Sequence, residues 1–339
     1  MPHGPHRLVD IAAQADLSLA TVDRVVNGRP GASARAVRAV ERAITDLDRQ
    51  QVSRRLRGKA LLIDVVMVAP TRFSSAVQRA LEGEIASLRS VTVRARFHLV
   101  EASSPAEVAA HLDRLGRRGM CDGLILKAPD DPMIAAAVDR CGGRGIPTVT
   151  LVTDVSSSDR VAYVGRDNRA AGASAAYLIG LATGERPGAA LATVSQRSFL
   201  GERERLEEFV ARCDREVVVS GDVDGLDRSM ERAVGAVLET RTDLVAVYSI
   251  GGGNRGIRAA LARAGCEPLA FVAHDLDADN VVLLREGALT AVLHHDLRRD
   301  ARRAIEQLLR ARGLLPGAPT AMLASVEIVT PWNIPPRLR

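Results

Sequence analysis

The feature that most restricts the fold is a series of short apolar, β-branched runs that starts at residue 61. Runs of this kind are typical of strands buried on both faces of a parallel sheet. They lie at 61–68, 94–100, 123–126, 148–151, 189–194, 217–220, 244–250, 270–273 and 291–293, and helical stretches between them include 74–88, 105–118, 168–183, 202–212 and 228–241. The alternation predicts βαβ units, with more strands than one small sheet needs.

The first 59 residues have a different pattern, which predicts three short helices at about 7–15, 19–26 and 33–47. Apolar residues recur at helical spacing in each stretch, and Ser18 can cap the second helix. Asn27 and Gly28 can end that helix. Three helices of this length bury little surface, so the unit is expected to be marginally stable alone.

Charge is distributed unevenly along the chain. Residues 1–59 hold 11 basic and 6 acidic residues, whereas the remaining 280 hold 35 of each. A basic segment of this kind favours a polyanionic partner, because phosphate contacts release counterions. Charge that merely keeps a short domain soluble is the alternative.

Composition excludes several classes of protein. The chain is 47% hydrophobic and 26% charged, as globular proteins are. We find no apolar run of the roughly 20 residues that span a bilayer, and no apolar secretion segment near Met1, so we expect a cytoplasmic protein without a membrane partner. The four widely spaced cysteines are expected to be reduced packing residues.

The segment from Leu8 to Gly28 reads Leu-Val-Asp-Ile-Ala-Ala-Gln-Ala-Asp-Leu-Ser-Leu-Ala-Thr-Val-Asp-Arg-Val-Val-Asn-Gly. It resembles, almost position by position, the helix-turn-helix headpiece of the lactose-repressor (LacI/GalR) family of transcription regulators. The resemblance implies that the second helix enters a DNA major groove, with base contacts from Leu19, Ala20 and Arg24 and phosphate contacts from Thr21 and Asn27. A small helical bundle without groove contacts is the alternative.

Two positions depart from the family pattern. Asp16 replaces the usual turn glycine, which requires it to adopt the left-handed conformation. Asp23 replaces a serine, so its carboxylate must pair with Arg24 or another nearby arginine, or accept from a cytosine amino group.

The segment Gln51-Val-Ser-Arg-Arg-Leu-Arg57 matches the family's hinge helix, which forms on the operator. The resemblance implies that Leu56 wedges into the minor groove and that Ser53 stands where the family has alanine. The family's Tyr-x-Pro-Asn lead-in is absent here. A plain charged linker is the alternative.

The remainder resembles the type I periplasmic sugar-binding fold that forms this family's sensor. The matching stretches are Tyr163-Val-Gly-Arg-Asp-Asn168 with Ala171-Gly172, Arg203-Glu-Arg-Leu-Glu-Glu-Phe209, Phe271-Val-Ala-His-Asp275 and Ala291-Val-Leu-His-His295. The resemblance implies an effector cleft between two lobes, and the expected effector-binding residues are Phe73, Asp154, Arg205, Asn254, Asp275 and His295. Arg205 and Asp275 would bind sugar hydroxyls, and Phe73 would stack on the ring.

Two other patterns carry less weight. Gly251-Gly-Gly-Asn-Arg-Gly256 follows a strand and could face a phosphorylated effector, but it lacks the P-loop and dinucleotide spacings. His294 and His295 are adjacent on a strand and point to opposite sides, which argues against a metal site. We find no catalytic constellation, so neither an enzyme nor a cofactor is expected.

The expected fold class is therefore an N-terminal all-α helix-turn-helix headpiece plus an α/β, two-lobed periplasmic-binding-protein-like domain with two doubly wound parallel sheets. The expected boundaries are 1–50 for the headpiece, 51–60 for the hinge and 61–339 for the effector-binding domain. Within the latter, lobe 1 takes about 61–164 and 296–325, and lobe 2 takes about 165–295 and 326–339, with Trp332 packed on or near it.

The expected function is that of a DNA-binding transcription regulator, a repressor, controlled by a small effector. Its expected partners are double-stranded operator DNA, a sugar, polyol or sugar phosphate, and a second copy of the chain in a homodimer or higher oligomer. A sugar-binding or sugar-processing protein with an incidental basic N-terminus is the alternative.

Overall fold

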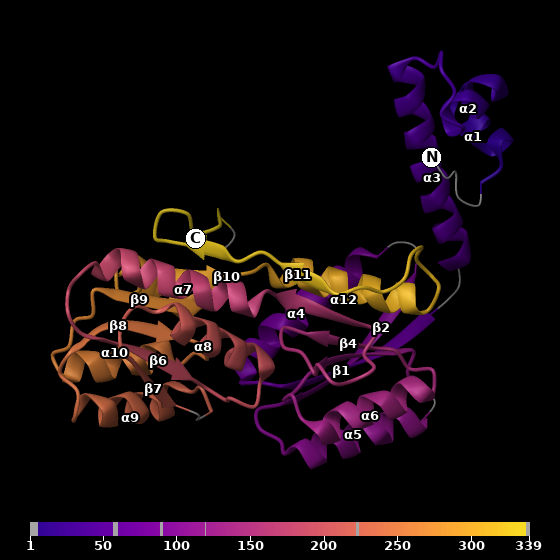
Figure 1. Ribbon diagram of the computed structural model, residues 1–339. Helices are drawn as coiled ribbons and strands as arrows, with labels where there is room; N and C mark the ends of the chain where they lie inside the picture. Colours follow the sequence, from indigo (N-terminus) through magenta and orange to yellow (C-terminus); the bar gives the residue numbers. More distant parts are fainter. Residues whose placement is uncertain (1–5, 57–59, 89–90, 119, 222–223, 337–339) are drawn as a thin grey trace.

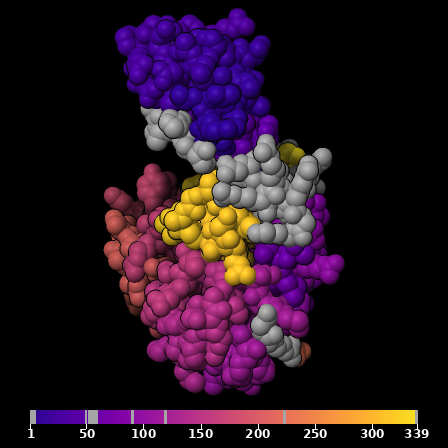
Figure 2. Space-filling view, turned by 90° about the vertical axis from the view of Figure 1, so that its right-hand side faces the viewer, coloured from indigo at the N-terminus to yellow at the C-terminus, as the bar shows by residue number. Residues whose placement is uncertain are grey.

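The computed structural model describes residues 6–56, 60–88, 91–118, 120–221 and 224–336, except for the side chains of 49, 51–56 and 118. Figure 1 shows a group of N-terminal helices that projects away from two α/β lobes lying side by side. The view in Figure 2, turned by 90°, shows the same helices as a separate mass above the lobes.

The N-terminal unit consists of α1 (Leu8–Ala15), α2 (Leu19–Val26) and α3 (Ala34–Leu56). Ile11, Val22 and Val40 are fully buried between them. The prediction for the third helix was wrong at its end, because α3 continues past residue 47 to Leu56. Residues 48–56 contain neither glycine nor proline, so nothing in the backbone stops the helix there. The segment predicted as a separate hinge is thus, as far as Leu56, the last part of α3.

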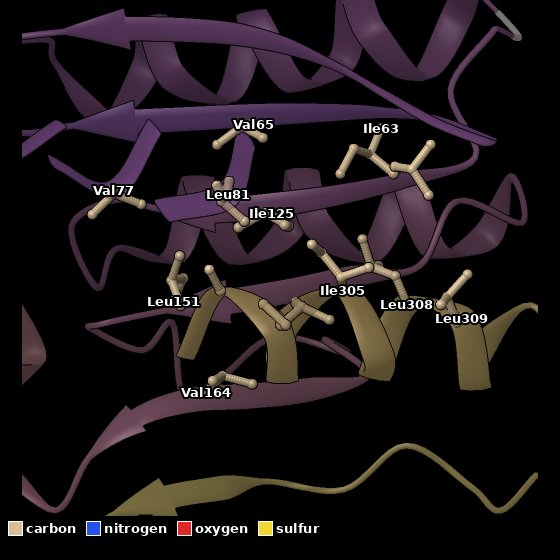
Figure 3. Close-up of a cluster of buried hydrophobic side chains, with 14 of the residues drawn as sticks. Ile63, Val65, Val77, Leu81, Ile125, Leu151, Val164, Ile305, Leu308 and Leu309 are labelled. Carbon is tan, nitrogen blue, oxygen red and sulfur yellow. The ribbon is translucent and has the colours of Figure 1, made fainter. Parts of the chain in front are cut away.

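The sheet of lobe 1 has the order β2-β1-β3-β4-β5-β11, and the pairs between neighbours are parallel. Its strands are β1 (Ala60–Val68), β2 (Thr92–Val100), β3 (Gly123–Lys127), β4 (Thr148–Leu151), β5 (Ala162–Arg166) and β11 (Met322–Ala324). The helices α4 (Thr71–Ser87) and α12 (Leu297–Ala311) cover one face, and α5 (Pro105–Arg118) and α6 (Pro132–Gly143) cover the other. Figure 3 shows how side chains of α12 and α4 meet those of β1, β3, β4 and β5 in the core.

The sheet of lobe 2 has the order β7-β6-β8-β9-β10-β12. Its strands are β6 (Ala189–Val194), β7 (Val217–Gly221), β8 (Leu244–Ser249), β9 (Ala270–His274), β10 (Ala291–His294) and β12 (Glu327–Val329). The helices α7 (Asn168–Thr183) and α8 (Leu200–Arg212) cover one face, and α9 (Asp227–Leu238), α10 (Asn254–Arg263) and α11 (Ala278–Arg285) cover the other. The prediction of a wholly parallel sheet was wrong at one edge, since β12 is antiparallel to β10. β11 runs toward the lobe boundary, parallel to β5, and β12 continues into the other lobe after two residues, so it runs away from the boundary and opposite to β10.

The chain passes between the lobes three times, after β5, after β10 and between β11 and β12. The carboxyl ends of the central strands of both sheets therefore face one another across the lobe boundary, where doubly wound folds bind their ligands. The C-terminal tail packs on lobe 2 through Val329 and Ile334. Trp332 is 88% exposed, so the expectation that it packs on this lobe was wrong. Among the described residues, no helix is both long and apolar enough to cross a membrane.

Candidate functional site

The N-terminal helices place the residues expected to contact DNA at the start of α2. Asp16 ends α1 in the left-handed conformation, at φ 51°, which confirms the requirement set by the missing glycine. Ser18 then caps α2 by accepting a hydrogen bond from the Thr21 amide at 3.3 Å. Leu19 and Ala20 are exposed at the first turn, so α2 presents small and apolar groups at its leading end.

Asp23 is paired within the N-terminal unit. Its carboxylate lies 2.8 Å from Arg29 and accepts a hydrogen bond of 2.7 Å from the Asn27 side chain. The expectation that Asp23 pairs with a nearby arginine is confirmed, and the pairing also fixes the side chain of Asn27. The side chains of Ser53 and Leu56 lie outside the described residues.

A cavity of about 860 Å³ lies between the two lobes, at the carboxyl ends of their strands. Four of the six expected effector residues line it, namely Phe73, Arg205, Asn254 and Asp275. Phe73 comes from α4 of lobe 1, and the other three come from α8, α10 and the end of β9 in lobe 2. The volume suits a small polar molecule.

Arg205 is held by the motif that follows β5. The Asn168 side chain accepts a hydrogen bond of 2.8 Å from Arg205 Nε, and the Ile250 carbonyl accepts another of 3.1 Å from the same guanidinium. A Cβ atom at Gly172 would lie 2.3 Å from the Arg205 carbonyl oxygen, so only glycine lets α7 and α8 approach this closely. Burial and the nearby Arg166 lower the pKa of Arg205. The family motif thus positions the arginine.

Asp275 belongs to a buried group that we call the crossover network, consisting of Arg166, Tyr248, His274, Asp275 and His295. Arg166 forms an ion pair with Asp275 and a hydrogen bond of 2.7 Å with His274 Nδ1. The other ring nitrogen of His274 shares a hydrogen bond of 2.7 Å with the Tyr248 hydroxyl. Burial lowers the pKa of His274 well below its usual range, so the ring is neutral.

The carboxylate of Asp275 stays ionised in this network. Burial acts to raise its pKa, but the charges of Arg166, His295 and Arg205 outweigh that effect and hold the pKa well below its usual value. Its backbone is left-handed, with φ 64°. Val152, a β-branched residue that lines the opposite wall, also has a positive φ of 70°. Conformations of this kind cluster at binding sites, where the surrounding structure holds them.

Two expected effector residues do not line the cavity. Asp154 forms an ion pair with Arg160 and accepts a hydrogen bond of 2.6 Å from Thr150 Oγ1, so it stabilises the loop after β4. His295 is turned toward Asp300 of α12, and its Nε2 lies 3.7 Å from the Asp275 carboxylate. Neither side chain lines the cavity, because Asp154 is engaged by Arg160 and Thr150 and His295 Nδ1 by Asp300. A contact of either residue with an effector stays a prediction.

Among the residues of the cavity wall that the sequence analysis missed are Lys127, Phe199 and Glu202. Lys127, the last residue of β3, is only 8% exposed, and its ammonium lies 3.9 Å from the ring centre of Phe199 and 5.7 Å from that of Phe73. Burial lowers its pKa to about 8. Glu202 lies at the start of α8. The rule that carboxyl ends of parallel strands face the ligand would have found Lys127, had the strand been extended by one residue.

The lobes are joined at the mouth of the cleft by polar contacts. Arg72 of lobe 1 lies 3.2 Å from Asp277 and 2.8 Å from Asp279, at the start of α11 in lobe 2. Arg203 of lobe 2 lies 2.8 Å from Asp130 of lobe 1. The structure therefore has the lobes in contact around the cavity.

The glycines of the loop before α10 are explained by packing. A Cβ atom at Gly251 would lie 2.3 Å from the Ser195 amide nitrogen, and one at Gly256 would lie 1.9 Å from the Asp227 carbonyl oxygen. Asn254 donates a hydrogen bond of 2.7 Å to Asn280, while its side-chain oxygen is buried without a partner among the described residues. That oxygen can accept a hydrogen bond from a ligand.

The described part of the chain was also examined for metal ligands and for disulfides. It contains no group of three or more histidine, cysteine or acidic side chains placed to bind a metal ion. The cysteines are free; Cys121 and Cys141 are buried, and Cys213 and Cys266 are partly buried.

Comparison with known proteins assigns the two-lobed part of the chain to a protein family. Residues 71–313, from α4 to just beyond α12, match the family described as periplasmic binding protein domain. The chain belongs to this family. The matched range contains the four predicted effector residues that line the cavity. The N-terminal helices lie outside it.

Two curated relatives of this chain are named as regulators. The "HTH-type transcriptional regulator reg1" of Streptomyces lividans is 31% identical over 205 residues, which cover 60% of this chain and 58% of the relative. An "uncharacterized HTH-type transcriptional regulator in aml 5'region" of Streptomyces limosus is 31% identical over 172 residues, which cover 49% and 46%. The chain thus spans about half the length of these relatives. Their names and the family match agree with the LacI/GalR resemblance found in the sequence.

Solved structures share the two-lobed fold. The glucose-galactose binding protein GanP from Geobacillus stearothermophilus has a TM-score of 0.73 at 16% identity, covering 82% of this chain and 99% of its own. A solute binding protein of an ABC transporter from Burkholderia graminis, in complex with D-arabinose, has a TM-score of 0.72 at 18% identity, covering 83% and 98%. At this identity the likeness establishes the fold alone.

Proposed function

We propose that the chain is a sequence-specific DNA-binding transcription regulator, a repressor, whose affinity for its operator is controlled by a small hydroxyl-rich effector in the interlobe cavity. The observation that carries the proposal is the joining of the two parts. A helix-turn-helix-like unit that exposes Leu19 and Ala20 on α2 precedes a two-lobed binding-protein domain. The excess basic charge of residues 1–59 supports a DNA partner.

The cavity supports binding rather than catalysis. Asp275 and Arg205 are fixed by partners within the protein, and the Asn254 side-chain oxygen offers one more acceptor. Carboxylate, guanidinium and amide groups beside an aromatic ring suit a sugar or polyol. Similar folds bind such molecules in the solved structures, which include complexes with D-arabinose and myo-inositol.

Control follows from differential binding. An effector that contacts both walls binds the closed arrangement of the lobes more tightly, and it shifts DNA affinity by that difference. We propose a homodimer, since two copies of α2 are needed to recognise two half-sites. A protein with this role works in the cytoplasm, where it meets the DNA.

The proposal is tested by selecting operator sequences from a DNA library with the full-length protein and measuring affinity by fluorescence anisotropy at two salt concentrations. Arg24→Ala should weaken binding to the selected sequence by about 1–3 kcal/mol and relax its preference at one base pair. Arg212→Ala, an exposed arginine of α8 paired with Glu208, is the matched control and should leave binding unchanged. Unaltered sequence preference in Arg24→Ala would mean that α2 does not contact the bases.

A further inference from the structure

Two buried cations face the cavity from opposite walls, and neither has a carboxylate partner among the described residues. The Lys127 ammonium of lobe 1 donates a hydrogen bond of 3.0 Å to the Val68 carbonyl. Arg205 of lobe 2 donates to an amide oxygen and to a backbone carbonyl, both of which are neutral. Each residue is less than a tenth exposed. Buried charges without a counter-ion are costly and rare in proteins.

The carboxylates nearby, those of Asp275 and Glu202, are partly exposed and already engaged. Asp275 is paired with Arg166. Glu202 accepts hydrogen bonds from the Ser195 amide at 2.8 Å, from the Ser195 hydroxyl and from the Gln196 amide at 3.1 Å. Both carboxylates therefore have strong donors of their own. Lys127 and Arg205 are therefore the two buried cations of the cavity wall that no carboxylate of the described residues pairs with.

We propose that the effector is a hydroxylated molecule with a single carboxylate, a sugar acid, whose carboxylate binds between Lys127 and Arg205. This inference rests on the proposed function of the cavity and specifies the chemical class of its ligand. A carboxylate there supplies both cations with a counter-ion, and because it touches both lobes it favours their closure. The hydroxyls are left for Asp275 and for the side-chain oxygen of Asn254.

The cation–π contact of Lys127 with Phe199 does not replace such a partner. The attraction of an aromatic face for a cation is weaker than the cost of removing a buried ammonium from water. The chain also uses lysine very sparingly, since Lys127 and Lys59 are its two lysines among 46 basic residues. An ammonium is a compact point charge, and at the end of β3 it fits between two aromatic rings.

The test uses matched pairs of acid and neutral ligands on the full-length protein at pH 7. Isothermal titration compares D-gluconate with sorbitol and D-glucuronate with D-glucose, and D-glucose 6-phosphate is the dianionic arm. At least one acid should bind ten or more times tighter than its neutral counterpart. In Lys127→Met that ratio should fall to within about threefold, while Lys127→Arg should keep a preference for the acid.

Arg258→Met, at an exposed ion pair with Glu286 on lobe 2, is the charge-matched control and should keep the full ratio. Thermal unfolding of each variant verifies that it is folded, and Lys127→Gln serves in its place if Lys127→Met is not. Neutral ligands that bind as tightly as the acids, binding of none of the acids, or binding of the phosphate alone would overturn the assignment. DNA affinity of the same preparation, measured without ligand, tests the proposed function separately, because it does not involve Lys127.

Discussion

Two regions of the cavity hold their charges in opposite ways. In the crossover network, the Arg166 guanidinium contacts the Asp275 carboxylate, the His274 ring and the Leu293 carbonyl. In the aromatic region formed by Phe73, Lys127 and Phe199, the ammonium has one backbone acceptor and two rings. Both cations lie at the ends of lobe 1 strands and both are buried. The first charge is balanced by the protein, and the second is left for a ligand.

The difference has a physical reason in the path of the chain. Arg166 is the last residue of β5 and stands immediately before the first crossover. Because the chain itself joins the lobes at this point, a network that spans both of them can persist there. Lys127 lies where the lobes must separate to admit a ligand, and a permanent counter-ion from the other lobe would be pulled away at each opening.

The largest expected effect comes from making the same substitution in both regions. Arg166→Met should lower the free energy of unfolding by about 1–3 kcal/mol, because it leaves the partly exposed Asp275 carboxylate and the buried His274 ring without their shared donor. Lys127→Met should change that free energy by less than about 1 kcal/mol, or raise it, because a poorly paired buried charge is removed. Urea unfolding of the ligand-free protein, followed by circular dichroism, measures both. Equal losses in the two variants would contradict the contrast between the regions.

The second prediction sharpens the comparison through pH. Lys127 has its pKa lowered by burial to about 8, with Glu202 and Asp275 raising it and Arg205 lowering it further. A carboxylate ligand stays ionised between pH 7 and pH 9, whereas the ammonium loses its proton. Affinity for the acid should therefore fall by roughly tenfold across this interval. His274, the neutral ring of the crossover network, has already lost its proton below this range.

The free energy of unfolding should rise as Lys127 loses its proton, whereas the affinity for the acid falls. The unfolded chain keeps the lysine proton up to its ordinary pKa near 10.4, so between about pH 8 and that value it binds more protons than the folded protein. Stability of the ligand-free protein should accordingly rise with pH in this window.

The titration of Lys127 can be followed by NMR. With only two lysines in the chain, ¹³C-labelled lysine gives few signals, and Lys127→Arg assigns them. In Lys127→Arg the affinity should be independent of pH; a fall like that of the wild type would show that another group titrates.

The architecture could be predicted from the sequence because burial on both faces leaves a continuous apolar run in each central strand. The same runs located the strand ends that carry Asp275 and Asn254 on loops beside the cavity. Arg205 was found through its family motif, and the structure adds why Asn168 and Gly172 belong to that motif. At these residues the sequence motif predicts a place beside the cavity, and the structure has the side chain there.

Where the structure differs from the expected lining of the cavity, the deciding factor is a partner that periodicity does not reveal. Asp154 is paired with Arg160 six residues later, and His295 with Asp300 five residues later. The sequence alone does not show whether the Asp154 carboxylate and the His295 ring face the cavity or a partner within the protein. The direction of β12 depends on the two-residue connection from the other lobe, and Lys127 was missed because its strand was ended at Leu126.

The smallest expected effect concerns the mouth of the cleft. The ion pairs there are exposed, in contrast to the buried Arg166 of the crossover network. Arg72 is about half exposed, and it spans the lobes to reach Asp277 and Asp279. Exposed ion pairs contribute about 0.2–1 kcal/mol and are screened by salt. Arg72→Met should thus weaken effector binding by about two- to fivefold at low salt, since the pair helps the lobes stay closed over the ligand. In 0.5 M salt the variant and the wild type should bind alike. Arg258→Met, whose ion pair with Glu286 lies within lobe 2, should match the wild type at both salt concentrations. A loss that persists at high salt would mean that Arg72 contacts the effector itself, in which case the mouth, like the aromatic region, would leave a charge for the ligand.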